Sequence, residues 1–401
     1  MNVSASSWHG RTASLVSPPI ASVNLLAARL AAGGADLIDL GQAILGIQPP
    51  PEALDGAREV LSSTTPHVYS PDPGLPELRE ALAAHLRDRK GVPCPSGQGV
   101  MVTCGANQAF ANALFALTRP GDEILTFGPG YFDHDYTIAM AGCRKVEVSL
   151  DSPDGSWQFD ADRVRAAITP RTRCVLLVSP GNPTGAVAGE AFVRELVALC
   201  EQRGLWIISD ETYGLLTFDP WRHVSPAAVG GFDRAAVLGT FSKLFAMAGW
   251  RLGYLAGPDR LIEEAFKVQD ALVICAPVIS QRAVLRALPA LDGFVSAARQ
   301  ELTVRRSALI QALRGWPEVE LRVPQGATFG LAKLVKGTDD VAFCESLVRR
   351  TGIVAVPGSA FGPVGVGHVR FSFGNQTVER LVEAGRRLRQ ADAREPTASS
   401  S

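Results

Sequence analysis

Short apolar runs alternate with amphipathic stretches along most of the chain, and this alternation predicts its secondary structure. Runs rich in Val, Leu, Ile and other apolar residues lie at residues 100–103, 123–127, 174–178, 205–209 and 235–238. Such runs are typical of strands that are buried on both faces of a sheet. Between them, apolar residues recur at helical spacing, as at Leu78, Leu82 and Leu86. Strands and helices that alternate from about residue 46 to residue 285 favour an α/β fold with a mostly parallel sheet.

The pattern changes after residue 285 and predicts a smaller α+β domain. We expect a charged helix at residues 294–313 and strands near residues 319–323 and 328–334. A last helix should carry one apolar face with Val378, Leu381, Val382 and Leu388. The predicted segments are an N-terminal arm with part of the small domain (1–45), a large domain (46–285), a small domain (286–390) and a disordered tail (391–401).

Composition narrows the class of protein. At 401 residues, with 46% hydrophobic and 20% charged residues, the chain is typical of a soluble globular protein that is long enough for two domains. The net charge of −1 gives no basic footprint, so we expect no nucleic-acid partner. We expect no signal peptide and no membrane helix, because the sequence has no sufficiently long apolar run. Seven cysteines without a C-x-x-C pair favour a reducing cytoplasm over a disulfide or zinc framework.

A lysine among small and apolar residues follows the strand predicted at residues 235–238. This stretch reads Gly239-Thr240-Phe241-Ser242-Lys243-Leu244-Phe245-Ala246-Met247-Ala248-Gly249-Trp250-Arg251. Partial desolvation lowers the pKa of a lysine and makes its amine a nucleophile. An arginine eight positions later suits a phosphate group. Taken alone, the same residues are equally consistent with a structural lysine and a surface salt bridge.

This stretch resembles the pyridoxal-phosphate lysine motif of the class I and II aminotransferases, with Thr240 where that pattern usually has Gly or Ser. The run Ser179-Pro180-Gly181-Asn182-Pro183-Thr184-Gly185 and the later Asp210-Glu211-Thr212-Tyr213 resemble other motifs of this family. The resemblance covers residues 37–390, with its motifs in the family's order. It implies the fold of the fold type I pyridoxal-phosphate enzymes: a large α/β domain, a smaller α+β domain and a homodimer with shared active sites.

The resemblance also implies a role for each matching residue around the cofactor. Lys243 would hold pyridoxal 5'-phosphate as a Schiff base and carry the catalytic proton, while Asp210 would pair with the pyridine nitrogen. Asn182 and Tyr213 would donate hydrogen bonds to the ring oxygen, and Tyr131 would stack on the ring. The predicted phosphate contacts are Gly105, Ala106, Asn107, Thr240, Ser242, Arg251 and the neighbouring subunit's Tyr69. We expect His134 to be a structural histidine and Glu211 to support its neighbours.

On the substrate side, the resemblance implies that Arg370 clamps the α-carboxylate, with Asn182 and Ala43 beside it. Two departures from the family concern this side. Ala43 and Leu45 replace a Gly and a Pro in the substrate loop, and Gly330 stands where an aromatic residue is frequent, which predicts extra room near the substrate. Residues 268–280 contain no Arg or Lys where aspartate-specific relatives would place one, so an acidic donor is disfavoured.

The predicted function is therefore a ping-pong aminotransferase acting on an L-amino acid and a 2-oxo acid. The departures in the substrate loop and at Gly330 leave open a lyase, cyclase or decarboxylase on the same scaffold. A third hypothesis, a cofactor-binding regulator fused to a DNA-binding module, is disfavoured by the charge and by the short segment before residue 37.

Overall fold

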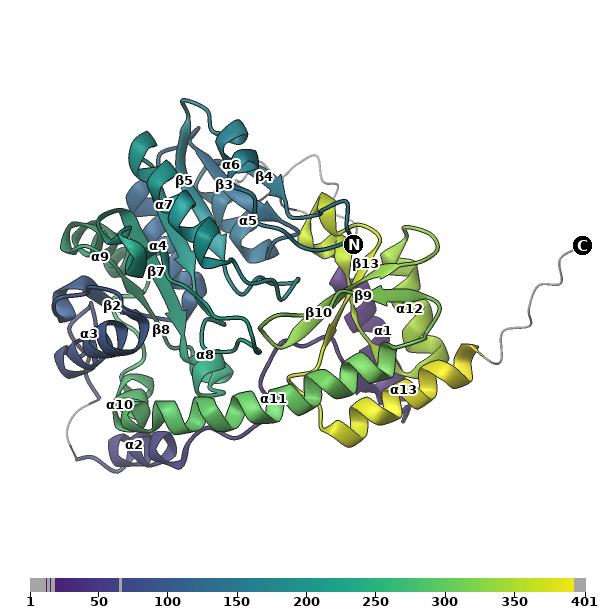
Figure 1. The fold of residues 1–401 in the computed structure, drawn as a ribbon. Helices are drawn as coiled ribbons and strands as arrows, with labels where there is room; N and C mark the ends of the chain where they lie inside the picture. The colour runs from purple at the N-terminus through teal and green to yellow at the C-terminus, as the bar shows by residue number, and fades with distance from the viewer. Residues whose placement is uncertain (1–11, 13–14, 16–18, 65–66, 393–401) are drawn as a thin grey trace, which may run out of the picture.

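The computed structural model describes residues 12, 15, 19–64 and 67–392 (Figure 1). The beginning of the segment predicted at residues 1–45 and most of the tail predicted at residues 391–401 lie outside these residues. Within the described part of the chain, no helix combines the length and apolar character needed to cross a membrane. The boundaries proposed at residues 45, 285 and 390 stay a prediction.

A seven-stranded sheet forms the centre of the larger part of the molecule. Its spatial order is β2 (Val100–Thr103), β8 (Gly253–Ala256), β7 (Ala235–Thr240), β6 (Trp206–Asp210), β5 (Thr172–Val178), β3 (Glu123–Gly128) and β4 (Arg144–Ser149). The five strands from β7 to β4 run parallel, which confirms the mostly parallel sheet. Strand β8 runs antiparallel to both of its neighbours, β2 and β7. The sequence pattern did not predict β4 or β8.

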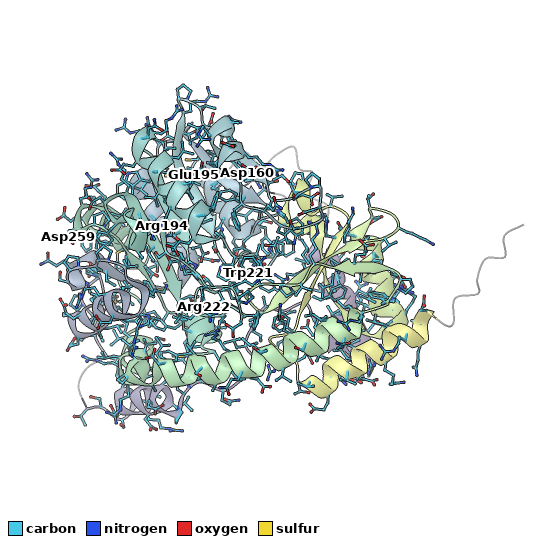
Figure 2. The ribbon with its side chains drawn as sticks, in the orientation of Figure 1. Asp160, Arg194, Glu195, Trp221, Arg222 and Asp259 are labelled. Atoms are coloured by element: carbon cyan, nitrogen blue, oxygen red, sulfur yellow. The ribbon has the colours of Figure 1, made fainter. Side chains whose placement is uncertain are left out.

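Helices cover both faces of this sheet (Figure 1). On one face, Cys174 and Leu176 of β5 pack with α4 (Ala106–Leu117), α5 (Phe132–Met140) and α9 (Asp259–Leu272). The alternate residues Val175 and Leu177 pack on the other face with α6 (Ala161–Ala167) and α7 (Glu190–Arg203). Because side chains alternate along a strand, a run apolar at every position can bury both faces. Asp160, labelled in Figure 2, caps α6 by accepting bonds from the backbone N–H groups of Asp162 and Arg163.

Three further helices pack near the β2 end of the sheet. They are α2 (Pro51–Leu61), α3 (Pro76–Lys90) and α10 (Val278–Ala287). Residues of all three join one apolar cluster with Val100 and Val102 of β2 and Val237 of β7. Leu78, Leu82 and Leu86 of α3 are all fully buried in this cluster, as their helical spacing predicts.

A second, smaller part contains an antiparallel sheet in the order β12 (Val356–Pro357), β13 (His368–Ser372), β10 (Phe329–Leu334) and β9 (Val319–Leu321). Beside it, β1 (Ile38–Asp39) pairs in parallel with β11 (Ile353–Val354). Its helices are α1 (Ile20–Ala32), α12 (Asp340–Thr351) and α13 (Val378–Asp392). In Figure 1 the long helix α11 (Leu291–Leu313) runs beneath both parts.

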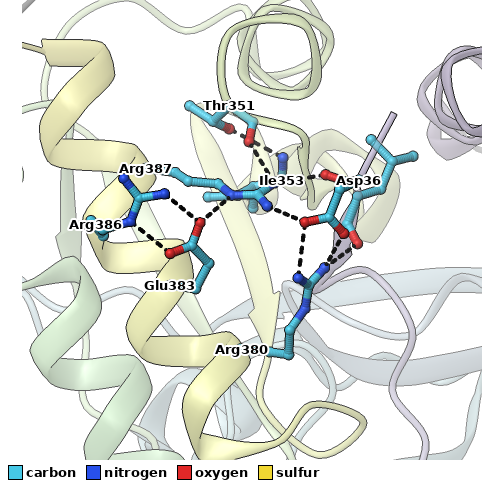
Figure 3. Close-up of polar contacts among 8 residues, drawn as sticks. Asp36, Thr351, Ile353, Arg380, Glu383, Arg386 and Arg387 are labelled. Atoms are coloured by element: carbon cyan, nitrogen blue, oxygen red, sulfur yellow. Dashed lines mark hydrogen bonds and ion pairs between the residues drawn. The ribbon is translucent and has the colours of Figure 1, made fainter. Parts of the chain in front are cut away.

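Helix α13 differs in one position from its predicted apolar face. Leu381 and Leu388 are buried, but Val382 is 58% exposed, so its assignment to the core was wrong. Arginines of the same helix hold the segment that leads into β1, as Figure 3 shows. Arg380 Nη2 lies 2.7 Å from Asp36 Oδ1, and Arg387 pairs with the other oxygen of Asp36. The hydrogen bonds from these two arginines lower the pKa of Asp36 to about 2.

Candidate active site

A cavity of about 740 Å³ lies where the C-terminal ends of β6 and β7 meet the smaller part of the molecule. The carboxyl edge of a parallel sheet is where α/β folds bind ligands. Twelve residues predicted from the sequence line this one cavity: Ala43, Ala106, Asn107, Tyr131, Asn182, Asp210, Tyr213, Thr240, Ser242, Lys243, Arg251 and Arg370. Of the other two predicted residues, Gly105 lies directly behind Arg251, whereas Tyr69 lines a different hollow.

Lys243 lies on the short helix α8 (Phe241–Leu244), which begins where β7 ends. Thr240 caps this helix, because its hydroxyl accepts a 3.2 Å bond from the Ser242 N–H. This turn directs the lysine into the cavity, where Nζ donates a hydrogen bond to the carbonyl of Ala43. Burial and, to a lesser extent, the charges of Arg370 and Arg251 lower the pKa of Lys243 to about 8. The amine is therefore much more often neutral, and so nucleophilic, than that of an exposed lysine.

Asp210 ends β6 and places a buried carboxylate on the floor of the cavity. Burial favours the neutral acid, but the contact with His134, at 3.3 Å between Nε2 and Oδ2, and the Thr212 N–H act against it and lower the pKa of Asp210. The carboxylate therefore stays ionised and can pair with a protonated nitrogen. Sequence analysis treated His134 as structural and missed this contact. No local sequence pattern marks this contact, because it joins a residue of α5 to one of β6.

The turn from β2 into α4 is suited to bind an anion. Gly105 has φ +85, and the helix begins at Ala106, so the unpaired N–H groups of its first turn face the cavity edge. Arg251 reaches the same place: Nη2 donates to the Cys104 carbonyl at 3.3 Å and Nη1 to Ser242 Oγ at 3.4 Å. A Cβ atom on Gly105 would lie only 2.6 Å from Arg251 Nη2, so glycine is required for this close approach.

Tyr131 and Asn107 are joined through a third side chain. The Tyr131 hydroxyl and the Asn107 amide both donate to Asp133 Oδ2, at 2.5 and 2.9 Å. The ring of Tyr131 also stands edge-on to His134, with 5.4 Å between centroids. These contacts fix the aromatic ring at the edge of the cavity, beside the groups that hold Asp210.

Arg370 on β13 is a fully desolvated guanidinium, and burial lowers its pKa to about 10. Nη1 donates to Asn182 Oδ1 at 3.0 Å, and Nη2 donates to the Gly41 carbonyl. Within the described part of the chain, Nε has no hydrogen-bond partner. The guanidinium lies 5.0 Å from the ring centroid of Phe329 and 5.1 Å from that of Phe361. Among the described residues no carboxylate forms an ion pair with Arg370, so this buried cation is suited to bind a carboxylate that enters the cavity.

Residues 39–43 form a strap that connects the two cations Lys243 and Arg370. Asp39 Oδ1 accepts bonds from the N–H groups of Gly41 and Gln42, at 2.7 and 3.3 Å. The carbonyls of Gly41 and Ala43 then accept from Arg370 and Lys243. The contribution of Ala43 thus comes from its backbone, which explains how the strap tolerates alanine in place of a second glycine.

Gly330 and Glu211 both lie outside the cavity lining, and the structure contradicts the expectation for the first and agrees with that for the second. Gly330 does not open space near the site: a Cβ there would lie 2.8 Å from Leu321 Cδ1 and 3.3 Å from Pro324 Cδ, so that prediction was wrong. Glu211 points away from the cavity into a buried ion pair, with 2.7 Å between its Oε2 and Lys90 Nζ. This agrees with the supporting role expected of Glu211.

Comparison with known proteins agrees with this geometry. The family model described as aminotransferase class I and II matches residues 35–388. The chain is 33% identical to the aromatic aminotransferase ISS1 of Arabidopsis thaliana over 95% of both chains. It is also 33% identical to an aspartate aminotransferase of Pyrococcus abyssi, over 90% of this chain and 92% of that one. The structure of the Thermus thermophilus aspartate aminotransferase with maleate superposes with a TM-score of 0.89 at 32% identity, covering 95% of this chain and 98% of that one.

Proposed function

Because this chain belongs to the class I and II aminotransferase family and is a pyridoxal-phosphate-dependent aminotransferase, we propose that it moves an amino group from an L-amino acid to a 2-oxo acid through Lys243. The observation that carries this proposal is the buried Lys243 amine, whose pKa is lowered to about 8 by burial in the same cavity as Arg370 and Asp210. The reaction would be ping-pong, with donor and acceptor using the same cavity in turn.

The residues of the cavity fit the chemical groups of pyridoxal phosphate. The N–H groups that open α4, together with Arg251, suit a phosphate, and the ionised Asp210 suits a protonated ring nitrogen. Asn182 uses its Oδ1 as an acceptor for Arg370, which leaves its amide N–H groups for the ring oxygen. When bound, the cofactor supplies an aldehyde that condenses with an amine and a ring that withdraws the electron pair left on Cα.

The catalytic steps assigned to this chain are binding and proton transfer. Arg370 binds the α-carboxylate and so orients Cα of the donor toward Lys243. The Lys243 amine, neutral above a pH of about 8, would take the proton from Cα of the donor and hold it on Nζ for its return. Asp210 holds a proton on the ring nitrogen throughout. The amide of Asn182 and the hydroxyl of Tyr213 donate to the ring oxygen, while Thr240, Ser242 and Tyr131 complete the binding site.

Two departures in the sequence left elimination, cyclisation or decarboxylation open on this scaffold: Gly330 and the altered strap. Only the strap remains as an argument for these reactions. Gly330 packs against Leu321 and Pro324 and adds no room for an unusual substrate. The other support, the altered strap with Ala43, retains backbone carbonyls on both Lys243 and Arg370. Transamination is therefore the outcome that the geometry favours.

We further infer that the active enzyme is a homodimer in which the partner copy supplies Tyr69. The Tyr69 side chain is 73% exposed and lines a separate hollow, so it cannot reach the cofactor cavity of its own chain. Neighbouring apolar side chains are also exposed: Val68 by 68% and Leu61 by 67%. An exposed apolar patch of this kind is typical of an interface between subunits.

Mixed dimers test the shared site and the role of Lys243 together. Tyr69→Ala should weaken cofactor affinity about tenfold or more, because a hydrogen bond to a charged phosphate is lost. Lys243→Ala should be inactive. Combining the two variants in one dimer creates one site with an intact Lys243 and the partner's intact Tyr69. At cofactor concentrations too low to load Tyr69→Ala homodimers, mixed dimers should regain activity, whereas a site built from one chain predicts no gain over the unmixed variants.

We also infer a reducing, cytoplasmic compartment for this enzyme. All seven cysteines are free, and Cys94, Cys174, Cys200 and Cys344 are buried. Burial raises the pKa of the Cys200 thiol to about 12, which keeps it protonated and unreactive.

A further inference from the structure

The charged residues that line the cavity limit the side chain a donor can carry. Among the described residues of its lining, the cations are Lys243, Arg251 and Arg370. The proposed function already assigns a role to each of them. Lys243 reacts with the aldehyde of the cofactor, Arg251 binds its phosphate, and Arg370 binds the α-carboxylate of the donor. No fourth cation in this part of the chain lines the cavity to receive a second carboxylate.

The carboxylates that line the cavity also disfavour an acidic side chain on the amino donor. Asp210 and Asp39 both line it, and Asp39 Oδ1 already accepts the N–H groups of Gly41 and Gln42. With Asp210 assigned to the ring nitrogen, an acidic side chain would still enter a cavity that contains Asp39 and has no cation left to pair with it. Transfer of an unpaired carboxylate out of water is strongly unfavourable.

One face of α1 forms a neutral wall of the same cavity. Ile20, Asn24, Ala27 and Ala28 lie on this face at helical spacing, and all four line the cavity. Phe132 and Ile20 also pack together against the cluster that contains Phe361, whose ring lies beside Arg370. The wall that α1 offers to a donor in this cavity therefore consists of apolar side chains and the one amide of Asn24.

The two arginines that line the hollow near the proposed subunit interface are paired with acids. Arg282 Nη1 lies 3.8 Å from Glu77 Oε1, and Arg286 Nη2 lies 3.6 Å from Glu59 Oε1. Both arginines line the hollow that contains Tyr69. The segment 268–280, beside the same hollow, contains no Arg or Lys. A partner subunit would thus bring aromatic and apolar groups, and already paired arginines, toward the cavity.

From these contacts we propose that the preferred amino donor has a neutral, largely apolar side chain, and that α1 is the wall that selects it. The proposal rests on the proposed function, since it assigns Lys243, Arg251 and Arg370 to the cofactor and the α-carboxylate. It distinguishes between the two kinds of relative found above, one named for aromatic and one for aspartate substrates.

Three donors of similar size provide the first test: leucine, asparagine and aspartate, with phenylalanine and glutamate added to cover longer side chains. Each is given to the holoenzyme together with the same 2-oxo acid acceptor, and the formation of the donor's own 2-oxo acid is followed to obtain kcat/KM. We expect the best neutral donor to exceed the best acidic donor at least about a hundredfold, because the acid pays for an unpaired buried charge. An acidic donor within tenfold of the best neutral one, or above it, overturns the proposal but leaves the aminotransferase function intact. Failure of all twenty amino acids would instead overturn the function itself.

A gain-of-function variant tests the wall. Asn24→Arg places a cation on the cavity face of α1, while Leu25→Arg places the same cation on the adjacent position, which is 54% exposed and does not line the cavity. We expect Asn24→Arg to raise the ratio of kcat/KM for aspartate to that for leucine at least about tenfold, while Leu25→Arg leaves it unchanged. The absorption of the bound cofactor and the melting temperature should be the same in both variants. An unchanged ratio in Asn24→Arg, or an equal change in Leu25→Arg, contradicts the assignment of α1.

Discussion

Replacing Lys243 with alanine is expected to lower the rate of transamination at least about a thousandfold. The substitution removes both the nucleophile and the group that transfers the proton, and general acid–base catalysis alone contributes about 10²–10⁴-fold. The amine lies on α8, at the end of β7, and its lowered pKa comes from burial in the cavity. The measurement is the single-turnover rate of conversion of an amino acid to its 2-oxo acid in the cofactor-loaded variant.

The matched control for this change is Lys333→Ala. Lys333 lies on β10, is exposed and does not line the cavity. Its variant should keep the wild-type rate. A small primary amine added to Lys243→Ala should restore part of the activity, because it can supply the missing base from solution. Full turnover by Lys243→Ala without any added amine would contradict the proposed route.

Loss of Arg370 is expected to have the second largest effect. Arg370→Ala should lower kcat/KM for amino acids roughly 30- to 4,000-fold, since truncation of one partner in a buried charge pair costs about 2–5 kcal/mol. Arg370→Lys should recover only part of this loss, because an ammonium group lacks the planar fork that binds a carboxylate at two points. The measurement is kcat/KM for the best donor in the three proteins.

A donor without the α-carboxylate separates this role from general damage to the site. The decarboxylated amine that corresponds to the best donor should react slowly with the wild type, and equally slowly with Arg370→Ala. Arg370 also holds Asn182 and the Gly41 carbonyl in place, so damage to the cavity would slow the amine as well. A parallel loss for the amino acid and the amine would show that Arg370 supports the cavity and does not bind the carboxylate.

The sequence predicted the central strands from their runs of mostly apolar residues, and the structure shows why these runs occur. Strands β3, β5, β6 and β7 lie in the middle of the large sheet, where both faces are covered. Strand β4, which reads RKVEVS, is an edge strand with several half-exposed side chains, so it has no continuous apolar run. Strand β8 has only four residues, and its antiparallel direction depends on pairing with β7 and with β2, which lies far away in the chain.

In the candidate site, too, some residues could be predicted from local sequence motifs, whereas others depend on contacts that form only in the folded chain. Lys243, Asp210 and Asn182 belong to recognisable local motifs, and the structure brings them into one cavity. The contact of His134 with Asp210 joins α5 to β6, so no local pattern predicts it. The room expected at Gly330 is filled by Leu321 and Pro324, which lie shortly before it in the chain and fold back against it. The wall formed by α1 was also missed, because the sequence analysis predicted no helix at residues 20–32.

The most direct test of the account is a product analysis of one half-reaction. The cofactor-loaded enzyme is mixed with each amino acid in turn, without an acceptor, and the 2-oxo acid, ammonia and carbon dioxide formed are all quantified. The proposed function predicts one equivalent of 2-oxo acid per active site, loss of the visible absorption of the lysine-bound cofactor, and no ammonia or carbon dioxide. Addition of a 2-oxo acid should then restore the absorption. Continued release of ammonia or carbon dioxide, with the absorption retained, would contradict transamination and establish a lyase or decarboxylase.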